Sequence, residues 1–102
     1  MVRVPRHREP TPPGAILLEE FLKPMGLSQR DLARGIRVPN RQVNDLIHQR
    51  HGITPGISLR LAKFFGTSAG FWMNLQLRCD LYRAQQAEGT VLKRIRRVRA
   101  AG

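Results

Sequence analysis

The chain has 102 residues, enough for one domain with a modest core and too few for two. Its 41% hydrophobic content excludes a chain that is disordered throughout, and its single cysteine excludes an internal disulfide. A formal net charge of +11 indicates a polyanionic partner, with nucleic acid ahead of an anionic membrane surface.

The positive charge is concentrated at the C-terminal end of the sequence. Residues 89–102 carry five basic side chains and no acidic one, whereas residues 14–88 carry ten basic and six acidic ones. Most of the basic residues are arginines, which suit phosphate and guanine, although Arg-rich codon usage explains that preference equally well. No apolar run approaches the ~20 residues of a membrane-spanning helix, and the N-terminal residues lack the apolar stretch of a signal peptide. The sequence therefore predicts a cytoplasmic protein.

The first helix is expected to follow a flexible arm. Residues 1–12 are rich in proline and basic side chains and have almost nothing to bury, which predicts a mobile N-terminal arm. Pro13 is suited to the first position of a helix, and Pro24 followed by Gly26 should end it. Four apolar residues fall at helical spacing between these points: Ile16, Leu17, Phe21 and Leu22.

Two short helices are predicted next. Ser28 is expected to cap the second helix, with Asp31 in its first turn. The third helix should begin at Pro39 or Asn40, after a short break at residues 34–38. The second helix is expected to bury Leu32, Ala33 and Ile36, and the third to bury Val43, Leu46 and Ile47.

The last two helices complete the predicted core. Thr54 and Pro55 mark the start of a fourth helix that ends at Gly66, with Ile57, Leu61, Phe64 and Phe65 on one face. Ser68 should cap a fifth helix that runs to about Ala87 and carries two apolar stripes. One stripe is Trp72, Leu75, Cys79 and Tyr82. The other is the candidate dimer interface, because a small core can cover only one of them: Met73, Leu77 and Leu81.

The domain is accordingly expected to span residues 13–88, with residues 89–102 as a basic C-terminal tail. In the tail, Val91, Ile95 and Val98 have helical spacing. It is expected to form a basic amphipathic helix when bound, or to remain disordered alone.

The layout of the second and third helices is typical of a DNA-reading helix-turn-helix. The face of the third helix opposite its buried residues is polar and rich in amides and arginine, side chains that can make paired hydrogen bonds to base edges. We therefore predict base readout by Asn40, Arg41, Gln42 and Asn44. Phosphate contacts are predicted for Gln29, Arg30, Arg37 and Arg50.

Structural alternatives exist for some of these residues. Arg41 and Asp45 are four residues apart and can form a surface ion pair instead of contacting bases. Asn40 can serve as a helix cap, and His48 is expected to be a solvated residue at the helix end. Gln42 and Asn44 have no evident structural role in the sequence, which favours the DNA-reading interpretation.

The sequence offers little support for metal binding or catalysis. His48 and His51 have the spacing of half a metal site, but no second pair completes it. Cys79 lies on an apolar stripe, which indicates a core cysteine and not a nucleophile. No catalytic constellation, metal site or cofactor motif is found, so the sequence does not predict an enzyme.

Several blocks of the sequence resemble HigA-family antitoxins, which belong to the Xre/Cro class of helix-turn-helix proteins. The resemblance covers about residues 12–82 and keeps the order and spacing of the blocks. They are Pro13 to Gln29, Ile53-Thr-Pro, Leu59 to Gln76 and Asp80-Leu, and the distinctive one is Gly-Thr-Ser-x-x-Phe-Trp-x-Asn-Leu-Gln within residues 66–76.

The resemblance implies an all-α, five-helix lambda-repressor-like domain that forms a homodimer on operator DNA in its own promoter. It also implies neutralisation of a HigB-like toxin, a ribosome-dependent mRNA endonuclease of the usually basic RelE-like group. Arg37 stands where many such turns have glycine, so either it takes a left-handed conformation or the turn differs. A standalone repressor without a toxin, and a scaffold whose tail meets RNA or an anionic membrane, are the rival interpretations.

Overall fold

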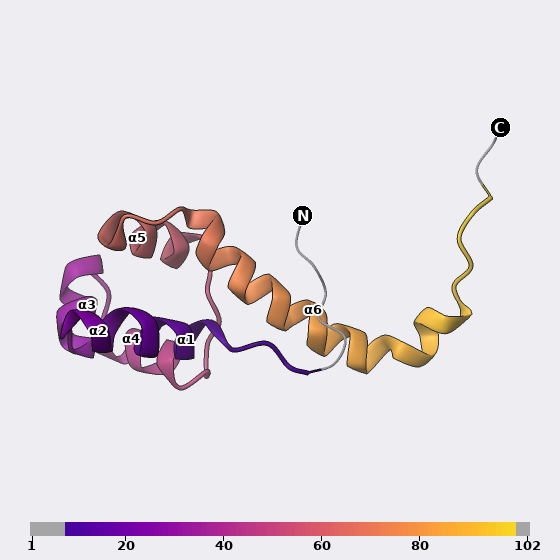
Figure 1. The fold of residues 1–102 in the computed structure, drawn as a ribbon, viewed down its shortest axis with the longest axis horizontal. Helices are drawn as coiled ribbons and strands as arrows, with labels where there is room; N and C mark the ends of the chain where they lie inside the picture. The colour runs from indigo at the N-terminus through magenta and orange to yellow at the C-terminus, as the bar shows by residue number, and fades with distance from the viewer. Residues whose placement is uncertain (1–7, 100–102) are drawn as a thin grey trace.

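The computed structural model describes residues 8–99 and is entirely helical over that range. Pro13 to Met25 form one continuous helical rod, made of α1 (Pro13–Ile16), a π-helical segment η1 (Leu17–Leu22) and α2 (Lys23–Met25). The other helices are α3 (Gln29–Ile36), α4 (Asn40–Ile47), α5 (Pro55–Phe65) and α6 (Ala69–Arg94). The predicted all-α fold with five helical rods is confirmed (Figure 1).

The starts and stops of these helices follow local sequence signals. The Ser28 and Asp31 pair forms a capping box, in which each side chain accepts a hydrogen bond from the backbone N–H of the other residue. Hydrogen bonding of the Asp31 carboxylate to Ser28, mainly to its backbone N–H, lowers the pKa of Asp31. Thr54 and Ser68 cap α5 and α6 in the predicted way, and Gly66 ends α5 in the left-handed conformation.

The π-helical segment reflects a proline inside the first rod. Pro24 lies in α2 and has no backbone N–H, and its ring would collide with the Glu20 carbonyl in a regular α-helix. The preceding turn widens, so that the backbone N–H of Lys23 bonds to the Leu18 carbonyl five residues back. The rod ends at Met25, just beyond the predicted stop near Pro24, and the left-handed Gly26 makes the turn that was expected there.

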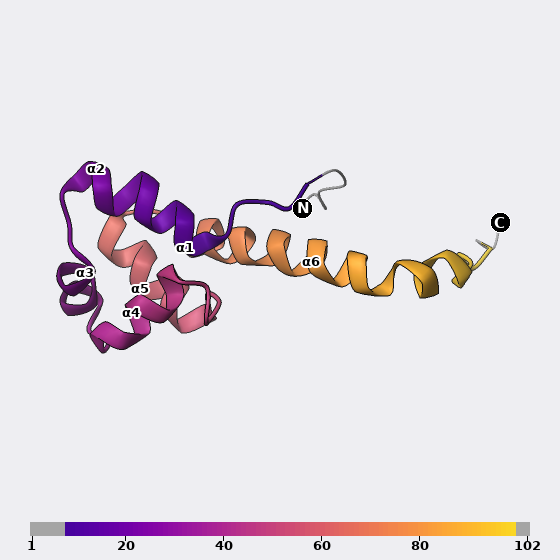
Figure 2. The ribbon, with the colours of Figure 1, turned by 90° about the horizontal axis from the view of Figure 1, so that it is seen from below.

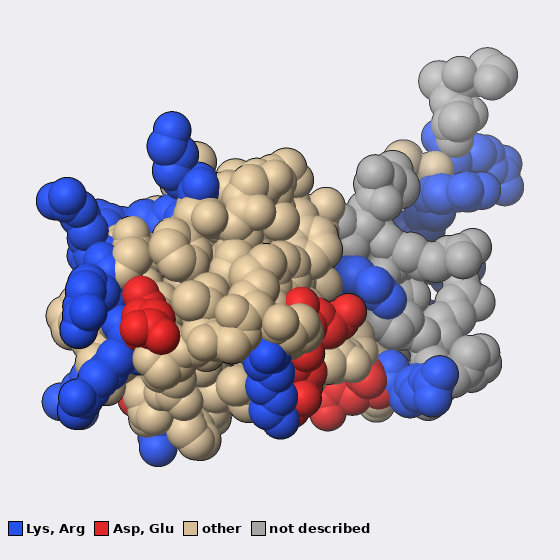
Figure 3. Space-filling view, turned by 60° about the vertical axis from the view of Figure 1, so that its left-hand side comes forward, with Lys and Arg blue, Asp and Glu red and all other residues tan. Residues whose placement is uncertain are grey.

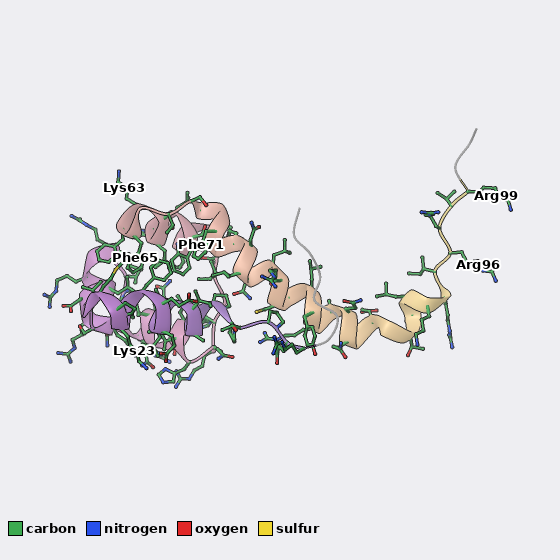
Figure 4. The ribbon with its side chains drawn as sticks, in the orientation of Figure 1. Lys23, Lys63, Phe65, Phe71, Arg96 and Arg99 are labelled. Atoms are coloured by element: carbon green, nitrogen blue, oxygen red, sulfur yellow. The ribbon has the colours of Figure 1, made fainter. Side chains whose placement is uncertain are left out.

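The core lies where α1, α3, α4, α5 and the start of α6 meet. Its largest member is Trp72, which is fully buried and donates a 2.7 Å hydrogen bond from Nε1 to Thr67 Oγ1. The ring centroids of Phe65 and Trp72 both lie within 6.0 Å of another aromatic ring, and the labelled Phe65 and Phe71 lie between α5 and the first rod (Figure 4). Phe64, which was predicted on the same face of α5 as Ile57 and Leu61, lies at the edge of the core, since the residue is 38% exposed and its ring covers Gly35.

Helix α6 extends well beyond this core (Figures 1 and 2). It ends at Arg94 and not near Ala87 as predicted, because Gly89 is tolerated inside it and two cations in its last turn favour the helix dipole. Residues 95–99 have no regular secondary structure. None of the helices described is long and apolar enough to cross a membrane.

Residues 8–12 lie alongside α6 (Figures 1 and 2). The Pro10 and Thr11 carbonyl oxygens are 3.8 and 3.7 Å from Cys79 Sγ, and Glu9 forms a 3.4 Å ion pair with Arg83. Residues 1–7 of the predicted arm are outside the described residues.

Candidate nucleic-acid interface

The turn between α3 and α4 is built on a left-handed arginine. Arg37 has φ 59° and ψ 49°, so of the two alternatives left open by the sequence the left-handed conformation is the one observed. The backbone N–H of Val38 then bonds to the Ala33 carbonyl, which closes the end of α3. Pro39 caps α4, and Asn40 is therefore its first helical residue and not its cap.

The polar face of α4 is turned away from the core as predicted. Val43, Leu46 and Ile47 are buried, whereas Asn40, Arg41 and Gln42 are exposed at the N-terminal end of the helix. The Arg41 side chain is 92% exposed. Three of the four predicted base-reading side chains are thus available at the end of α4 that a recognition helix presents to bases.

Asn44, the fourth of these residues, is placed differently. It is half-buried, and both ends of its side-chain amide are engaged within the protein. Its Nδ2 donates to Gln29 Oε1 at 3.0 Å, and its Oδ1 accepts from Arg50 Nη1 at 3.2 Å. The expectation that Asn44 has no structural role is wrong, because both ends of its amide are bonded within the protein. The contact with Gln29 has no local signal in the sequence, since the two residues are fifteen positions apart.

Asp45 is the centre of a small charge cluster at the end of α4. Its carboxylate is 16% exposed and lies 3.2 Å from Arg50, 3.6 Å from His51 and 4.0 Å from Arg41. The ion-pair alternative for Arg41 and Asp45 is present at the limit of contact distance, which leaves the Arg41 guanidinium largely open to solvent. His48 is exposed at the helix end, with Nδ1 2.9 Å from the Asn44 carbonyl oxygen.

The predicted phosphate-binding residues lie at the ends of α3 and in the segment after α4. Gln29 is the first residue of α3, and Arg30 and Arg37 are exposed at its two ends. Arg50 follows α4 and its side chain is 58% exposed. Lys and Arg side chains gather along one edge of the face in Figure 3, with one acidic group beside them, and the other acidic side chains lie further across the same face.

Arg60 supports the helix-turn-helix through a contact that could not be predicted from the sequence. Its Nη1 donates to the Ile36 carbonyl at 2.7 Å and to the Arg37 carbonyl at 3.3 Å, so α5 holds the end of α3 in place. Its partners are more than twenty residues away, and no local motif signals this contact.

The two apolar stripes of α6 differ in how far they are buried. Trp72 and Cys79 are buried, whereas Met73 and Leu81 are half-buried and Leu77 is 42% exposed. The stripe that was predicted to serve as a dimer interface is therefore the more exposed one.

Cys79 has the environment of a core residue. Burial raises the pKa of its thiol, which disfavours the reactive thiolate form. Within residues 8–99, no three His, Cys, Asp or Glu side chains are grouped closely enough to hold a metal ion.

These features define the class of the protein. Two short helices joined by a tight turn, with the second helix exposing a polar N-terminal face, form a helix-turn-helix. A helix-turn-helix family model matches residues 18–72, more than half of the chain, and the chain belongs to that family.

Comparison with known proteins shows which members of the helix-turn-helix family the chain is similar to. The chain is 42% identical over 79 residues to virulence-associated protein I of Dichelobacter nodosus, covering 78% of this chain and 73% of that protein. It is 38% identical to the Pseudomonas aeruginosa antitoxin HigA solved with the higBA promoter, with a TM-score of 0.81 over 87% of this chain and 97% of that one. A second P. aeruginosa structure, solved with 18-bp operator DNA, is also 38% identical, with a TM-score of 0.86 over 92% of this chain and 100% of that one.

These similarities confirm the resemblance to HigA antitoxins that the sequence blocks indicated. The family consists of DNA-binding regulators and not of enzymes.

Proposed function

We propose that this chain is the antitoxin of a type II toxin–antitoxin module, acting in the cytoplasm. It binds operator DNA as a dimer, represses its own operon and neutralises a HigB-like mRNA endonuclease. The observation that carries the DNA-binding part is the exposed face of α4, where Asn40, Arg41 and Gln42 point away from the core. The two similar P. aeruginosa structures solved with promoter or operator DNA support it.

The proposed dimer follows from the geometry of DNA. Two recognition helices related by twofold symmetry reach adjacent major grooves when they are about 34–36 Å apart. The stripe of Met73, Leu77 and Leu81 on α6 is the apolar surface we assign to this contact. Arg30, Arg37, Arg50 and the basic side chains of residues 89–102 add phosphate contacts, which depend on salt concentration.

The test compares one base-reading residue with the tail. Arg41 suits the O6 and N7 atoms of guanine, so Arg41→Ala should weaken binding to the chain's own promoter more than binding to random DNA. Deletion of residues 90–102 should instead weaken both and make the dependence of affinity on salt less steep. Fluorescence anisotropy at several salt concentrations measures both quantities. Equal losses on promoter and random DNA for both variants would contradict the proposal.

The toxin part of the proposal has its own test. Like charges across an interface are costly, so we place a basic toxin on the helical body, where Glu20 and Asp80 are exposed, and away from the basic tail. Coexpression with the neighbouring small open reading frame should restore growth that the toxin alone arrests, and the two proteins should copurify. Promoter binding without rescue or copurification would leave a standalone repressor.

A further inference from the structure

The side chain of Asn44 links three parts of the helix-turn-helix. Its amide nitrogen donates to Gln29 at the start of α3, and its amide oxygen accepts from Arg50 in the segment after α4. Gln29 is itself half-buried, so the first contact is shielded from water. Asn44 therefore touches two of the side chains assigned to phosphate contacts.

The backbone brings Arg50 back along α4 to make this contact. Gln49 is left-handed, with φ 61°, and the backbone N–H of Arg50 donates to the Asp45 carbonyl at 2.8 Å. Arg50 Nη1 lies 3.2 Å from both Asn44 Oδ1 and Asp45 Oδ1. One nitrogen of the guanidinium is thus fixed, while more than half of the side chain remains open to solvent.

Asn44 differs in this respect from the other amides on α4. To identify adenine, an amide must present both its oxygen and its nitrogen to the base edge. Both groups of Asn44 are used inside the protein, whereas in the described part of the chain the side chains of Asn40 and Gln42 make no hydrogen bond.

We propose that Asn44 is a positioning residue, which sets Gln29 and Arg50 for phosphate contact and reads no base. The inference rests on the proposed DNA-binding function. Under this proposal, residues 40–42 at the start of α4 read bases, and Asn44 positions the phosphate-contacting side chains.

The test is Asn44→Ala, measured on promoter and random DNA across a salt series. The variant removes one of the two contacts that hold Arg50 Nη1 and leaves only the contact with Asp45. Affinity for both DNAs should therefore fall by the same factor, and the slope of log affinity against log salt should become less steep by up to about one. The control is Gln42→Ala, the exposed amide on the same helix, which should lose promoter preference and keep its salt slope.

A double-mutant cycle shows whether the effect passes through Arg50. In an Arg50→Ala background, Asn44→Ala should cause no further change in slope, since the contact it supports is already absent. Loss of promoter preference with an unchanged slope in Asn44→Ala would overturn the proposal and make Asn44 a base reader. An unchanged slope with a lower melting temperature would also overturn it, because the role would then be purely structural.

Failure of the proposed function gives a different pattern. If the intact chain binds promoter and random DNA equally, sequence-specific repression is excluded, yet the slope on random DNA still decides the role of Asn44. The NMR signals of the Arg50 guanidinium in the DNA-free protein provide a further readout. They should shift in Asn44→Ala and stay in place in Gln42→Ala.

Discussion

The contact around Gly14 shows that a single position in this domain can leave no room for a side chain. Gly14 is buried in the first turn of α1, and a Cβ at this position would collide with the carbonyl oxygen of Leu46 and approach Ile47. Gly56 occupies the same position in α5, but a Cβ there would meet nothing within 4 Å. The absence of a side chain at Gly14 is therefore what lets α1 lie against the end of α4.

Gly14→Ala should consequently destabilise the protein by about 1–3 kcal/mol, the usual cost of overpacking a close contact. Gly56→Ala should be neutral or stabilise by about 0.4–1 kcal/mol, because it only reduces the freedom of the unfolded chain. Urea denaturation measures both free energies of unfolding. Similar values for the two variants would show that α1 does not depend on this close approach.

The candidate site was predictable where the signals were local. Arg37 occupies a turn position that often holds glycine, and the exposure of Arg41 follows from the spacing of Val43, Leu46 and Ile47. Asn44 could not be assigned in this way, because its bond to Gln29 joins residues fifteen positions apart. The contacts of Arg60 with the end of α3 escaped prediction for the same reason.

Helix α6 has different properties along its length. Its first half packs against α5 and α1, and its second half contacts little of the body. The start was predictable from Ser68, whose hydroxyl accepts from the Phe71 N–H. The end was not, since the sequence between Ala87 and Arg94 contains no proline, and a glycine alone does not stop a helix.

The exposed stripe of α6 supports a prediction about assembly. Leu77→Asp should convert a dimer to a monomer, because it places a charge in the middle of an apolar contact. The fold should survive, since Leu77 is 42% exposed and contributes little to the core. Sedimentation equilibrium gives the mass, and circular dichroism checks the fold.

Gln86→Asp is the matched control for this variant. Gln86 is exposed nine residues further along α6 and half a turn round the helix from Leu77, so its replacement should leave the dimer intact. A dimeric Leu77→Asp variant would exclude this stripe from the interface.

At the scale of the whole molecule, charge and shape are separated into two regions. The helical body carries nearly all the acidic side chains, whereas residues 89–99 carry five cations and no acidic side chain. Arg96 and Arg99 project from the segment beyond α6, away from the body (Figure 4). Four large apolar side chains in this region are also exposed, among them Val98 at 86%. A polyanion can therefore engage this end without contacting the compact body.

The projecting helix also affects how the protein moves through solution. The molecule measures 55 × 27 × 22 Å along its principal axes, so its frictional drag exceeds that of a sphere of 11.6 kDa. On a column calibrated with spherical standards, a single copy will elute early and imitate a larger species. Only a method that measures molar mass independently of molecular shape, such as light scattering, gives the correct number of copies.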